Sequence, residues 1–406
     1  MEFRLFYTAL ALCLILSCKK HGLSSGVPVN TQINDTPTIS NFEPMIGAPG
    51  IPVEIWGHHF DDSASHLLVQ FGGTTAAVYS TNDSVMHVYV PAGVTTGRIS
   101  ITRGGLTGVS DSLFRVLSGG HWAQKSGIPG ADSANGRFVG IGFSVGGKGY
   151  MGLGDGNDGN FYSDLYQYDP VTDTWTQEAS APVAIAGAIC MVINNIAYIG
   201  LGATSVSVNS NAFFAYDPAT NIWTRKADYP GTGQGLAVGI AIDSIGLVGL
   251  GDNNYGDEIP EVWIYHPTTD SWTQKANFVG ILPGWAVGFS LDNKTAYVEG
   301  TDYYTGAFIN VLYQYDPSTD AWTQKRSRPG GVMAQASTMI INGNGYILGG
   351  GEENWMYQPG TDSWTQVPFF TQRNGAASFV IGGAGYFGNG GGIAQTAITD
   401  LWQFTP

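Results

Sequence analysis

The chain has 406 residues, a formal net charge of −15 and an ordinary hydrophobic content of 43%. Only 17 lysines and arginines are present. Because they form no basic cluster, the chain lacks a phosphate-neutralising surface, and nucleic-acid binding is excluded. Glycine is abundant, at 58 residues, and charged residues make up only 12%, which is typical of an all-β protein with many tight turns.

Residues 1–17 predict an export signal. Arg4 gives it a positive start, and the apolar core from Leu5 to Leu16 is too short to span a bilayer comfortably. The signal leads into Ile15-Leu16-Ser17-Cys18, which resembles a bacterial lipobox. The resemblance implies that Cys18 is lipidated and becomes the mature N-terminus. Ordinary cleavage nearby, or an uncleaved anchor, is the alternative.

Residues 18–35 are predicted to form the lipidated cysteine and a flexible tether, because they are rich in Ser, Gly, Pro, Asn and Thr. We therefore expect a cell-envelope protein whose only membrane contact is the lipid on Cys18. The expected location is the bacterial outer membrane, with the periplasmic or surface facing left open.

Residues 36–117 contain short runs that mostly alternate apolar and polar residues between turn signals. Six or seven such runs at regular spacing predict a β-sandwich. The segments Pro37 to Pro44, Val53 to Phe60, Val69 to Gly73 and Val90 to Gly93 resemble an IPT/TIG domain. The resemblance implies an immunoglobulin-like fold that serves as a spacer or a protein-contact module.

From residue 119 onward, a tract of the form Tyr-Asp-Pro-x-Thr-Asp-x-Trp recurs about every fifty residues, which predicts stacked modules. Its complete copies are Tyr168–Trp175, Tyr216–Trp223, Tyr265–Trp272, Tyr315–Trp322 and Tyr357–Trp364. A sixth copy stops at Pro406, and His121-Trp122-Ala123-Gln124 carries the tryptophan strand that it lacks. The pattern predicts a ring closed by exchange of one strand, which removes exposed sheet edges.

Each module begins with two nearly continuous apolar runs, as expected for inner strands that are buried on both faces. Six such pairs and six tryptophan strands predict six blades. The predicted fold is therefore all-β: an immunoglobulin-like β-sandwich over 36–117, then a six-bladed β-propeller over 119–406, closed by an N-terminal strand. The repeats resemble Kelch propellers, including those related to galactose oxidase. They depart from that pattern because the paired glycine after the second strand remains only at Gly349-Gly350 and Gly390-Gly391.

In a propeller, the loops between blades and the loops from second to third strands line one mouth of the axial channel, where ligands usually bind. Aligning the modules gives one mouth position per blade: Arg137, Ile185, Gln234, Pro283, Met333 and Arg373. Arg137 and Arg373 fall in neighbouring blades and would be able to clamp a carboxylate or phosphate. Solvated or ion-paired arginines are the alternative.

The same loops carry aromatic residues interspersed with acidic ones. This combination suits a sugar, because aromatic rings stack on its C–H face while carboxylates accept its hydroxyls. Packing within the loops is the alternative. The candidate ligand-binding residues are Arg137, Arg373, Gln234, Trp285, Tyr162, Tyr255, Tyr303 and Tyr304.

The predicted function is non-catalytic binding of a glycan or an envelope protein at the mouth. The alternative is a sugar-processing enzyme, such as a sialate epimerase, that acts at Arg137 and Arg373; a pure scaffold is a third reading. Copper chemistry of the galactose-oxidase kind needs ligating His and Tyr and a cross-linked Cys. The ring offers only His121, His266 and Cys190, which sits in an apolar run. We therefore expect no metal or other cofactor.

Overall fold

The structure is a computed structural model, which describes residues 35–117, 120–129, 136–205, 208–253, 255, 257–280, 284–302, 309–351, 353–368, 373–391 and 397–406. The chain divides into two units, Met1–Asp35 and Thr36–Pro406. The predicted signal, Cys18 and nearly all of the tether lie outside the described residues. In the described part of the chain, no helix is both long and apolar enough to cross a membrane.

Residues 36–117 form the expected sandwich of two sheets, with strand orders β1-β3-β7-β6 and β2-β9-β8-β4-β5. A short 3-10 turn, η1 (Ala64–His66), precedes β4. The strands are β1 (Thr38–Glu43), β2 (Ile46–Gly47), β3 (Pro52–His58), β4 (Leu67–Phe71), β5 (Thr74–Ala76), β6 (Val78–Thr81), β7 (Val85–Tyr89), β8 (Gly97–Arg103) and β9 (Leu106–Val116).

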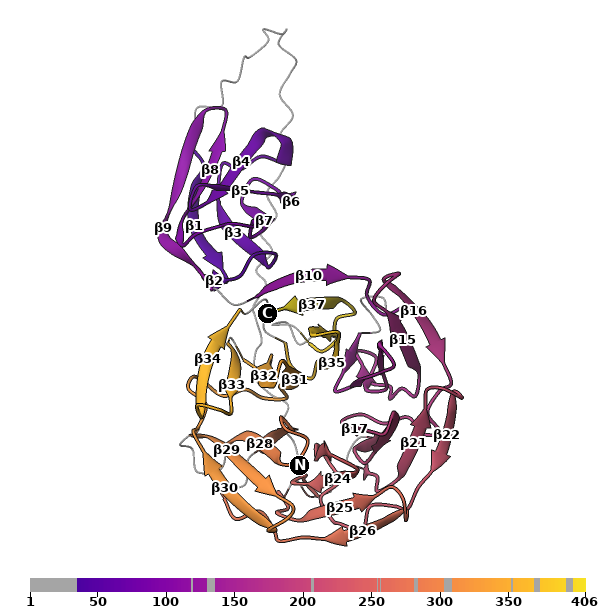
Figure 1. Ribbon diagram of the computed structural model, residues 1–406. Coiled ribbons are helices and arrows are strands. Elements are labelled where there is room, and N and C mark those ends of the chain that lie inside the picture. Colours follow the sequence, from indigo (N-terminus) through magenta and orange to yellow (C-terminus); the bar gives the residue numbers. More distant parts are fainter. Residues whose placement is uncertain are drawn as a thin grey trace. The chain divides into compact units, whose positions relative to one another are not determined.

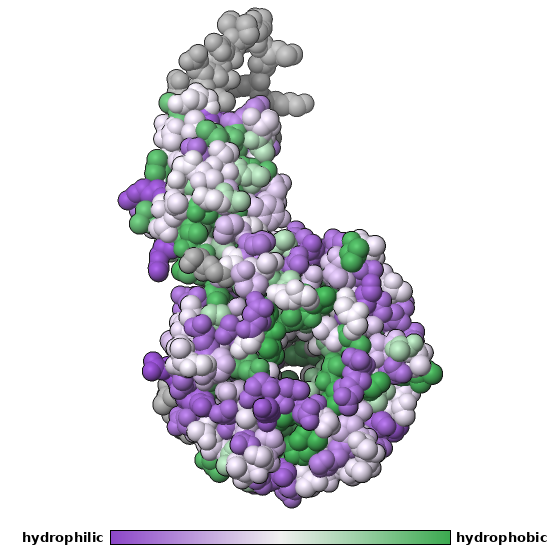
Figure 2. Space-filling model, in the orientation of Figure 1, coloured by the Kyte–Doolittle hydropathy of each residue, from purple (hydrophilic) through white to green (hydrophobic). Residues whose placement is uncertain are grey.

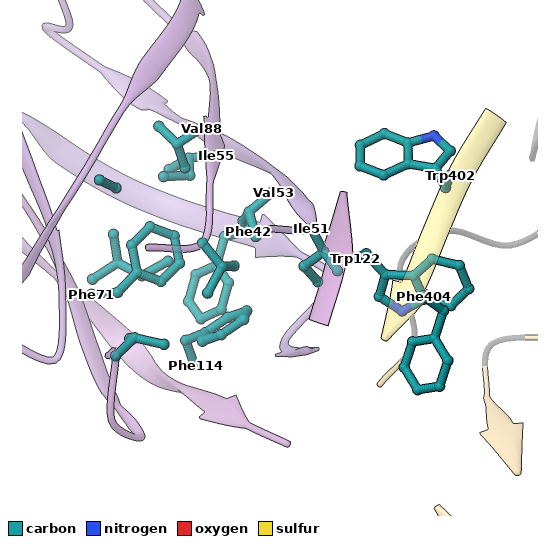
Figure 3. Packing of buried hydrophobic residues seen from close by; sticks show 14 of the residues in the cluster. Phe42, Ile51, Val53, Ile55, Phe71, Val88, Phe114, Trp122, Trp402 and Phe404 are labelled. Atoms are coloured by element: carbon teal, nitrogen blue, oxygen red, sulfur yellow. The ribbon is translucent and has the colours of Figure 1, made fainter. Parts of the chain in front are cut away.

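The core of the sandwich comes from alternate residues of these strands, because successive side chains of a strand point to opposite faces. In β3, Val53 and Ile55 are fully buried, while Glu54 between them is not. They pack in one cluster with Phe42, Phe71 and Phe114 (Figure 3). The rings of Phe71 and Phe114 meet edge to face at 5.0 Å.

The described residues from 120 onward form six four-stranded sheets arranged as the blades of a ring (Figure 1). The first three blades are β12 (Ile141–Val145), β13 (Lys148–Gly152), β15 (Leu165–Asp169) and β16 (Thr174–Glu178); β17 (Ile189–Ile193), β18 (Ile196–Gly200), β21 (Phe213–Asp217) and β22 (Ile222–Arg225); and β23 (Val238–Ile242), β24 (Ile245–Gly249), β25 (Val262–His266) and β26 (Ser271–Gln274).

The other three blades follow the same order, except that the sixth takes its outer strand from the start of the ring. They are β27 (Gly284–Phe289), β28 (Ala296–Asp302), β29 (Ile309–Asp316) and β30 (Ala321–Lys325); β31 (Ser337–Ile341), β32 (Asn344–Leu348), β33 (Asn354–Gln358) and β34 (Ser363–Val367); and β35 (Ala377–Ile381), β36 (Ala384–Gly388), β37 (Leu401–Thr405) and β10 (His121–Lys125).

Strand β10 closes the ring, as the sequence predicts. It pairs antiparallel with β37 in a register that sets Trp122 opposite Phe404. The two rings lie 4.9 Å apart (Figure 3), and the Trp122 indole Nε1 donates to the carbonyl of Pro368 at 3.1 Å. The predicted all-β fold, with a sandwich followed by a six-bladed propeller, is confirmed.

The repeated tyrosine, aspartate and tryptophan join each blade to the one before it. Ser126 shows the joint: its N–H donates to Asp173 Oδ1 at 3.0 Å, and its carbonyl accepts from Trp175 Nε1 at 2.7 Å. Tyr168 Oη donates to the same Oδ1 at 2.7 Å. Ala179, Ala227 and Arg326 are held in the same way by the next blade. The motif is therefore structural.

Small residues at one position of the inner strands let neighbouring blades approach around the channel. A side chain at Gly142 would put its Cβ 2.4 Å from the Ser378 carbonyl oxygen, and one at Gly239 would lie 2.8 Å from Ile189 Cβ. The Ser378 hydroxyl donates to the Thr338 carbonyl at 2.9 Å. Gly142, Gly239 and Ser378 are accordingly among the residues that line the channel.

Two minor strand pairs, β11 (Arg137–Phe138) with β14 (Asp155–Gly156) and β19 (Ala203–Ser205) with β20 (Val208–Asn209), together with isolated bridges, extend beyond the inner strands at one end of the ring. The pair β11–β14 and the bridges Ala186–Ala203, Gly235–Asp252 and Asn374–Gly391 join the loops between blades to the loops from second to third strands. This end is the mouth.

Candidate functional site

The axial channel opens at the centre of the ring, where hydrophobic residues follow part of its edge (Figure 2). The channel has a volume of about 680 Å³ and is lined by the inner strands. A smaller cavity of about 140 Å³ lies at the mouth. One residue from each blade lines it with a left-handed backbone, and we call this set the collar: Val139, Gly187, Leu236, Trp285, Gln335 and Gly375.

Backbone hydrogen bonds run around the collar from blade to blade. Gly187 N–H donates to the Val139 carbonyl at 2.9 Å, Val139 N–H to Gly375 at 2.8 Å, and Gly375 N–H to Gln335 at 2.9 Å. These amides and carbonyls are already engaged. Recognition at the collar therefore depends on its side chains.

Trp285 is the largest side chain of the collar, and its φ of 51° is unusual for a bulky residue. Glycine occupies the equivalent positions, 187 and 375, in two other blades. Val139, Leu236 and Gln335 share this left-handed backbone, so the conformation belongs to the fold at this position, and Trp285 stands apart by its aromatic side chain. Gln335, in the next blade, places an amide on the same cavity. Trp285 was a sequence candidate, whereas Gln335 was not.

The predicted mouth position lies two residues before the collar, and most of its side chains are turned into the protein. The predicted alignment places equivalent residues of these blades together. Each of four carbonyls accepts from a glycine N–H of the preceding blade, namely those of Arg137, Ile185, Gln234 and Arg373. However, Ile185 and Met333 are buried, and Pro283 lies outside the described residues. The lining of the mouth cavity is thus displaced by two residues from the predicted position.

Arg137 is only 7% exposed and forms an ion pair within its own blade. Its Nη2 donates to Asp164 Oδ2 at 2.8 Å, and its guanidinium carbon lies 3.4 Å from the centre of the Tyr162 ring. Tyr162 Oη donates to Asp158 Oδ2 at 2.7 Å, and this hydrogen bond raises the pKa of Tyr162. Arg137 therefore holds Tyr162 in place.

Arg373 repeats this arrangement in the sixth blade. It is 1% exposed, and its guanidinium makes a bidentate ion pair with Asp400, with Nη1–Oδ1 at 2.5 Å and Nη2–Oδ2 at 2.9 Å. Ion pairing, the alternative considered from the sequence, is what the structure shows for both arginines. In this geometry neither guanidinium is presented to a ligand at the mouth.

The remaining candidates fall on the mouth loops or outside the described residues. Gln234 is half-buried, and its Nε2 donates to the Gly231 carbonyl at 3.2 Å. Tyr255 is 91% exposed at the tip of a loop that Asn253 organises by accepting from the Tyr255 N–H. Tyr303 and Tyr304 lie outside the described residues.

Two half-buried carboxylates, Asp155 and Asp252, lie beside the collar at equivalent positions of the first and third blades. Asp155 pairs with Phe138, which precedes the collar residue Val139. Asp252 pairs with Gly235, which precedes the collar residue Leu236. Burial raises the pKa of both carboxyls. No cation among the described residues forms an ion pair with either one, which explains why burial dominates.

Cys190 is one of the described residues that line the channel, and it is not among those that line the mouth cavity. Burial raises the pKa of its thiol. It therefore stays neutral and unreactive at ordinary pH, because the thiolate is the nucleophile.

Fold and site together define a chain with an immunoglobulin-like domain and a six-bladed β-propeller whose mouth carries aromatic, amide and carboxylate groups. Residues 37–116 match the model of the IPT/TIG domain family. Among solved structures, that of YjhT resembles this chain with a TM-score of 0.56 and 14% identity, covering 66% of this chain and 94% of YjhT. At that identity the likeness shows the fold alone. No curated protein matches the sequence.

Proposed function

We propose that the propeller binds a glycan at its mouth without transforming it. The collar of one strained tryptophan, a neighbouring amide and aliphatic side chains carries this proposal. Sugars are bound by aromatic stacking on their C–H faces and by polar groups at their hydroxyls, and pockets of this kind are mostly apolar with few polar groups. Trp285 and Gln335, which both line the mouth cavity, would supply the stacking surface and an amide, and the carboxylates Asp155 and Asp252 beside the collar would accept from hydroxyls at its edge.

Tyr162 and Tyr255 extend the proposed site along the loops. Arg137 acts on it indirectly, because its guanidinium covers the Tyr162 ring. The outer part of a longer glycan would reach the exposed Tyr255.

Glycan-array binding by the full-length chain, purified in mild detergent, tests the proposal. We expect binding to be lost in Trp285→Ala and kept in Tyr79→Ala, a matched control that removes a 49% exposed tyrosine from the sandwich. Binding that survives Trp285→Ala, or a chain that binds no sugar and instead co-purifies with an envelope protein, would contradict it. The second of these results would favour the protein-binding form of the function.

A sugar-processing enzyme is the second candidate, and one observation favours it. Asp155 and Asp252 are half-buried beside the collar, and burial raises the pKa of both carboxyls, a pattern that clusters at catalytic sites. An epimerase or hydrolase would need one of them as its acid or base. Turnover of an array-positive sugar, lost in Asp155→Asn or Asp252→Asn, would replace the binding role with this one.

We also propose that Cys18 carries lipid and anchors the chain to the outer membrane. The lipobox-like sequence before it supports this location. Metabolic labelling with a fatty acid should label the wild-type chain, and Cys18→Ser should abolish the label and release the protein from membranes. An unlabelled wild-type chain would refute the anchor.

A further inference from the structure

We infer that the part of a glycan that enters the mouth is uncharged, and that the mouth rejects anionic sugars such as uronic and sialic acids. This inference rests on the proposed function and names the class of sugar that its site selects. It depends on the charges around the mouth and on how each is already compensated.

The arginines of the mouth are not available to bind an anion. Arg137 and Arg373 are paired with Asp164 and Asp400 as described above. Arg328 begins the loop before the fifth blade and is buried completely, and its Nε donates to Glu299 Oε1 at 2.7 Å. Recruiting any of these guanidinium groups to a ligand would leave its carboxylate partner unpaired, and that partner is buried for Glu299 and half-buried for Asp164 and Asp400, which is unfavourable.

Between residues 149 and 274 the sequence has only two lysines or arginines, Arg225 and Lys226, at the end of the outer strand β22. Residues 149–224 and 227–274 contain none. A carboxylate of the ligand would therefore meet no compensating positive charge there.

Two carboxylates stand where a ligand would approach. Asp155 has a buried oxygen without a hydrogen-bond partner among the described residues. The carboxylate of Asp252 lies against Gly235, where an added Cβ would approach within 1.8 Å of its Oδ1, and this oxygen accepts from Asn209 Nδ2 at 3.5 Å. Neither carboxylate forms an ion pair among the described residues, so both would repel an anion.

The collar is neutral, and the channel behind it carries an acidic residue only at its far end among the described residues. No collar residue is ionisable, and Cys190 remains a thiol because burial raises its pKa. Asp292 is the acidic residue among those that line the channel; it lies in the turn beyond β27, at the opposite end, where it accepts from the Lys294 N–H at 2.9 Å. An uncharged ring or acetamido group is compatible with this lining, whereas a carboxylate would lose its hydration without a partner.

A matched pair of probes tests the inference. One is the neutral oligosaccharide with the strongest array signal, and the other is the uronate made from it by oxidation at C6. By isothermal titration calorimetry in low salt, we expect the uronate to bind the full-length chain at least about tenfold more weakly, since like charges brought together at an interface are unfavourable. The difference should shrink at about 1 M salt, where screening reaches about 3 Å.

The double variant Asp155→Asn, Asp252→Asn should narrow the difference between the two probes, while the matched control Asp83→Asn, in the exposed part of the sandwich, should leave it unchanged. A uronate that binds as well as its neutral parent would overturn the inference and leave the proposed function standing. An array that detects no glycan at all would overturn both.

Discussion

At the scale of single residues, the repeated motif works through the chemistry of each position. The second aspartate of the motif ends a turn in the left-handed conformation, with φ of 54° at Asp173 and 49° at Asp270. Aspartate and asparagine tolerate this conformation better than most residues. The same carboxylate accepts from the tyrosine of its own blade and from a backbone N–H of the preceding blade. One side chain therefore shapes the turn and joins two blades.

Asp270 offers a direct test of this dual role. Asp270→Ala removes the acceptor for Tyr265 Oη and for the Ala227 N–H, and we expect it to lower the free energy of unfolding by about 1–3 kcal/mol. Asp270→Asn should cost less, because Asn221 fills this position in the second blade and accepts the same two bonds. Urea denaturation measures both. Equal losses in the two variants would contradict the role of the acceptor oxygen.

Acid should weaken these joints. Burial raises the pKa of Asp173, Asp270 and Asp362, but hydrogen bonds from a tyrosine and a backbone N–H outweigh it, so each folded pKa lies below the ordinary 3.8. A lowered folded pKa gives stability that is complete above the ordinary value and is lost as pH falls through the folded value. The melting temperature should therefore fall steeply below about pH 4, and less steeply in Asp270→Asn. Matching acid slopes for the variant and the wild type would refute this.

Trp285 should show a conflict between stability and binding. Trp285→Gly removes a left-handed bulky residue, which relieves about 1–2 kcal/mol of backbone strain and offsets the lost contacts. We expect a melting temperature within a few degrees of wild type, measured by calorimetry, together with loss of glycan binding. Leu236→Gly makes the same backbone change at another collar position and is the matched control for the melting temperature. A large loss of stability would mean that the tryptophan is structural.

At the scale of elements, the fourth blade departs from its neighbours. Its second strand carries Glu299, where glycine stands at 152, 200 and 249 in the first three blades. Glu299 is buried with Arg328, whose Nη2 also donates to Asn310 Oδ1 at 3.1 Å. Burial raises the pKa of Glu299, and Arg328 opposes that shift. The pair ties β28 to the loop that leads into the fifth blade.

Removing one partner of this pair should be costly. Arg328→Met leaves the Glu299 carboxylate buried without its partner, and we expect a loss of about 3–5 kcal/mol in the free energy of unfolding. The double variant Arg328→Met, Glu299→Met should recover most of that loss, since an apolar pair of similar volume avoids the buried charge. Thermal and urea denaturation of the wild type, the single variant and the double variant measure these differences in stability. A double variant no more stable than Arg328→Met would contradict the argument.

At the scale of the whole molecule, ring closure was predictable because Trp122 and the terminal segment are two halves of one repeated pattern. The motif residues are fixed by hydrogen bonds that few other side chains can make, so they mark the blades in the sequence. The ion pairs of Arg137 and Arg373 were harder to predict from the sequence. Each arginine pairs with an acid 27 residues later, just before a third strand, and this shared spacing was the signal for ion pairs.

The collar was not predictable in full from the sequence. Its members, Val, Gly, Leu, Trp, Gln and Gly, share a backbone conformation and no side-chain type. Only Trp285 stood out, because an aromatic residue at the start of an inner strand is unusual in this chain. Gln335 gave no such signal, since a single glutamine before a strand is common.

Hydrogen–deuterium exchange of the full-length chain, with and without the neutral oligosaccharide that binds most strongly on the array, tests the central claim that the mouth is the binding site. The account predicts new protection at the collar segments around residues 236, 285 and 335 and in the loop that carries Asp155. Protection confined to the sandwich, or to the turns at Asn194-Asn195 and Asp292-Asn293 at the opposite end of the channel, would contradict it.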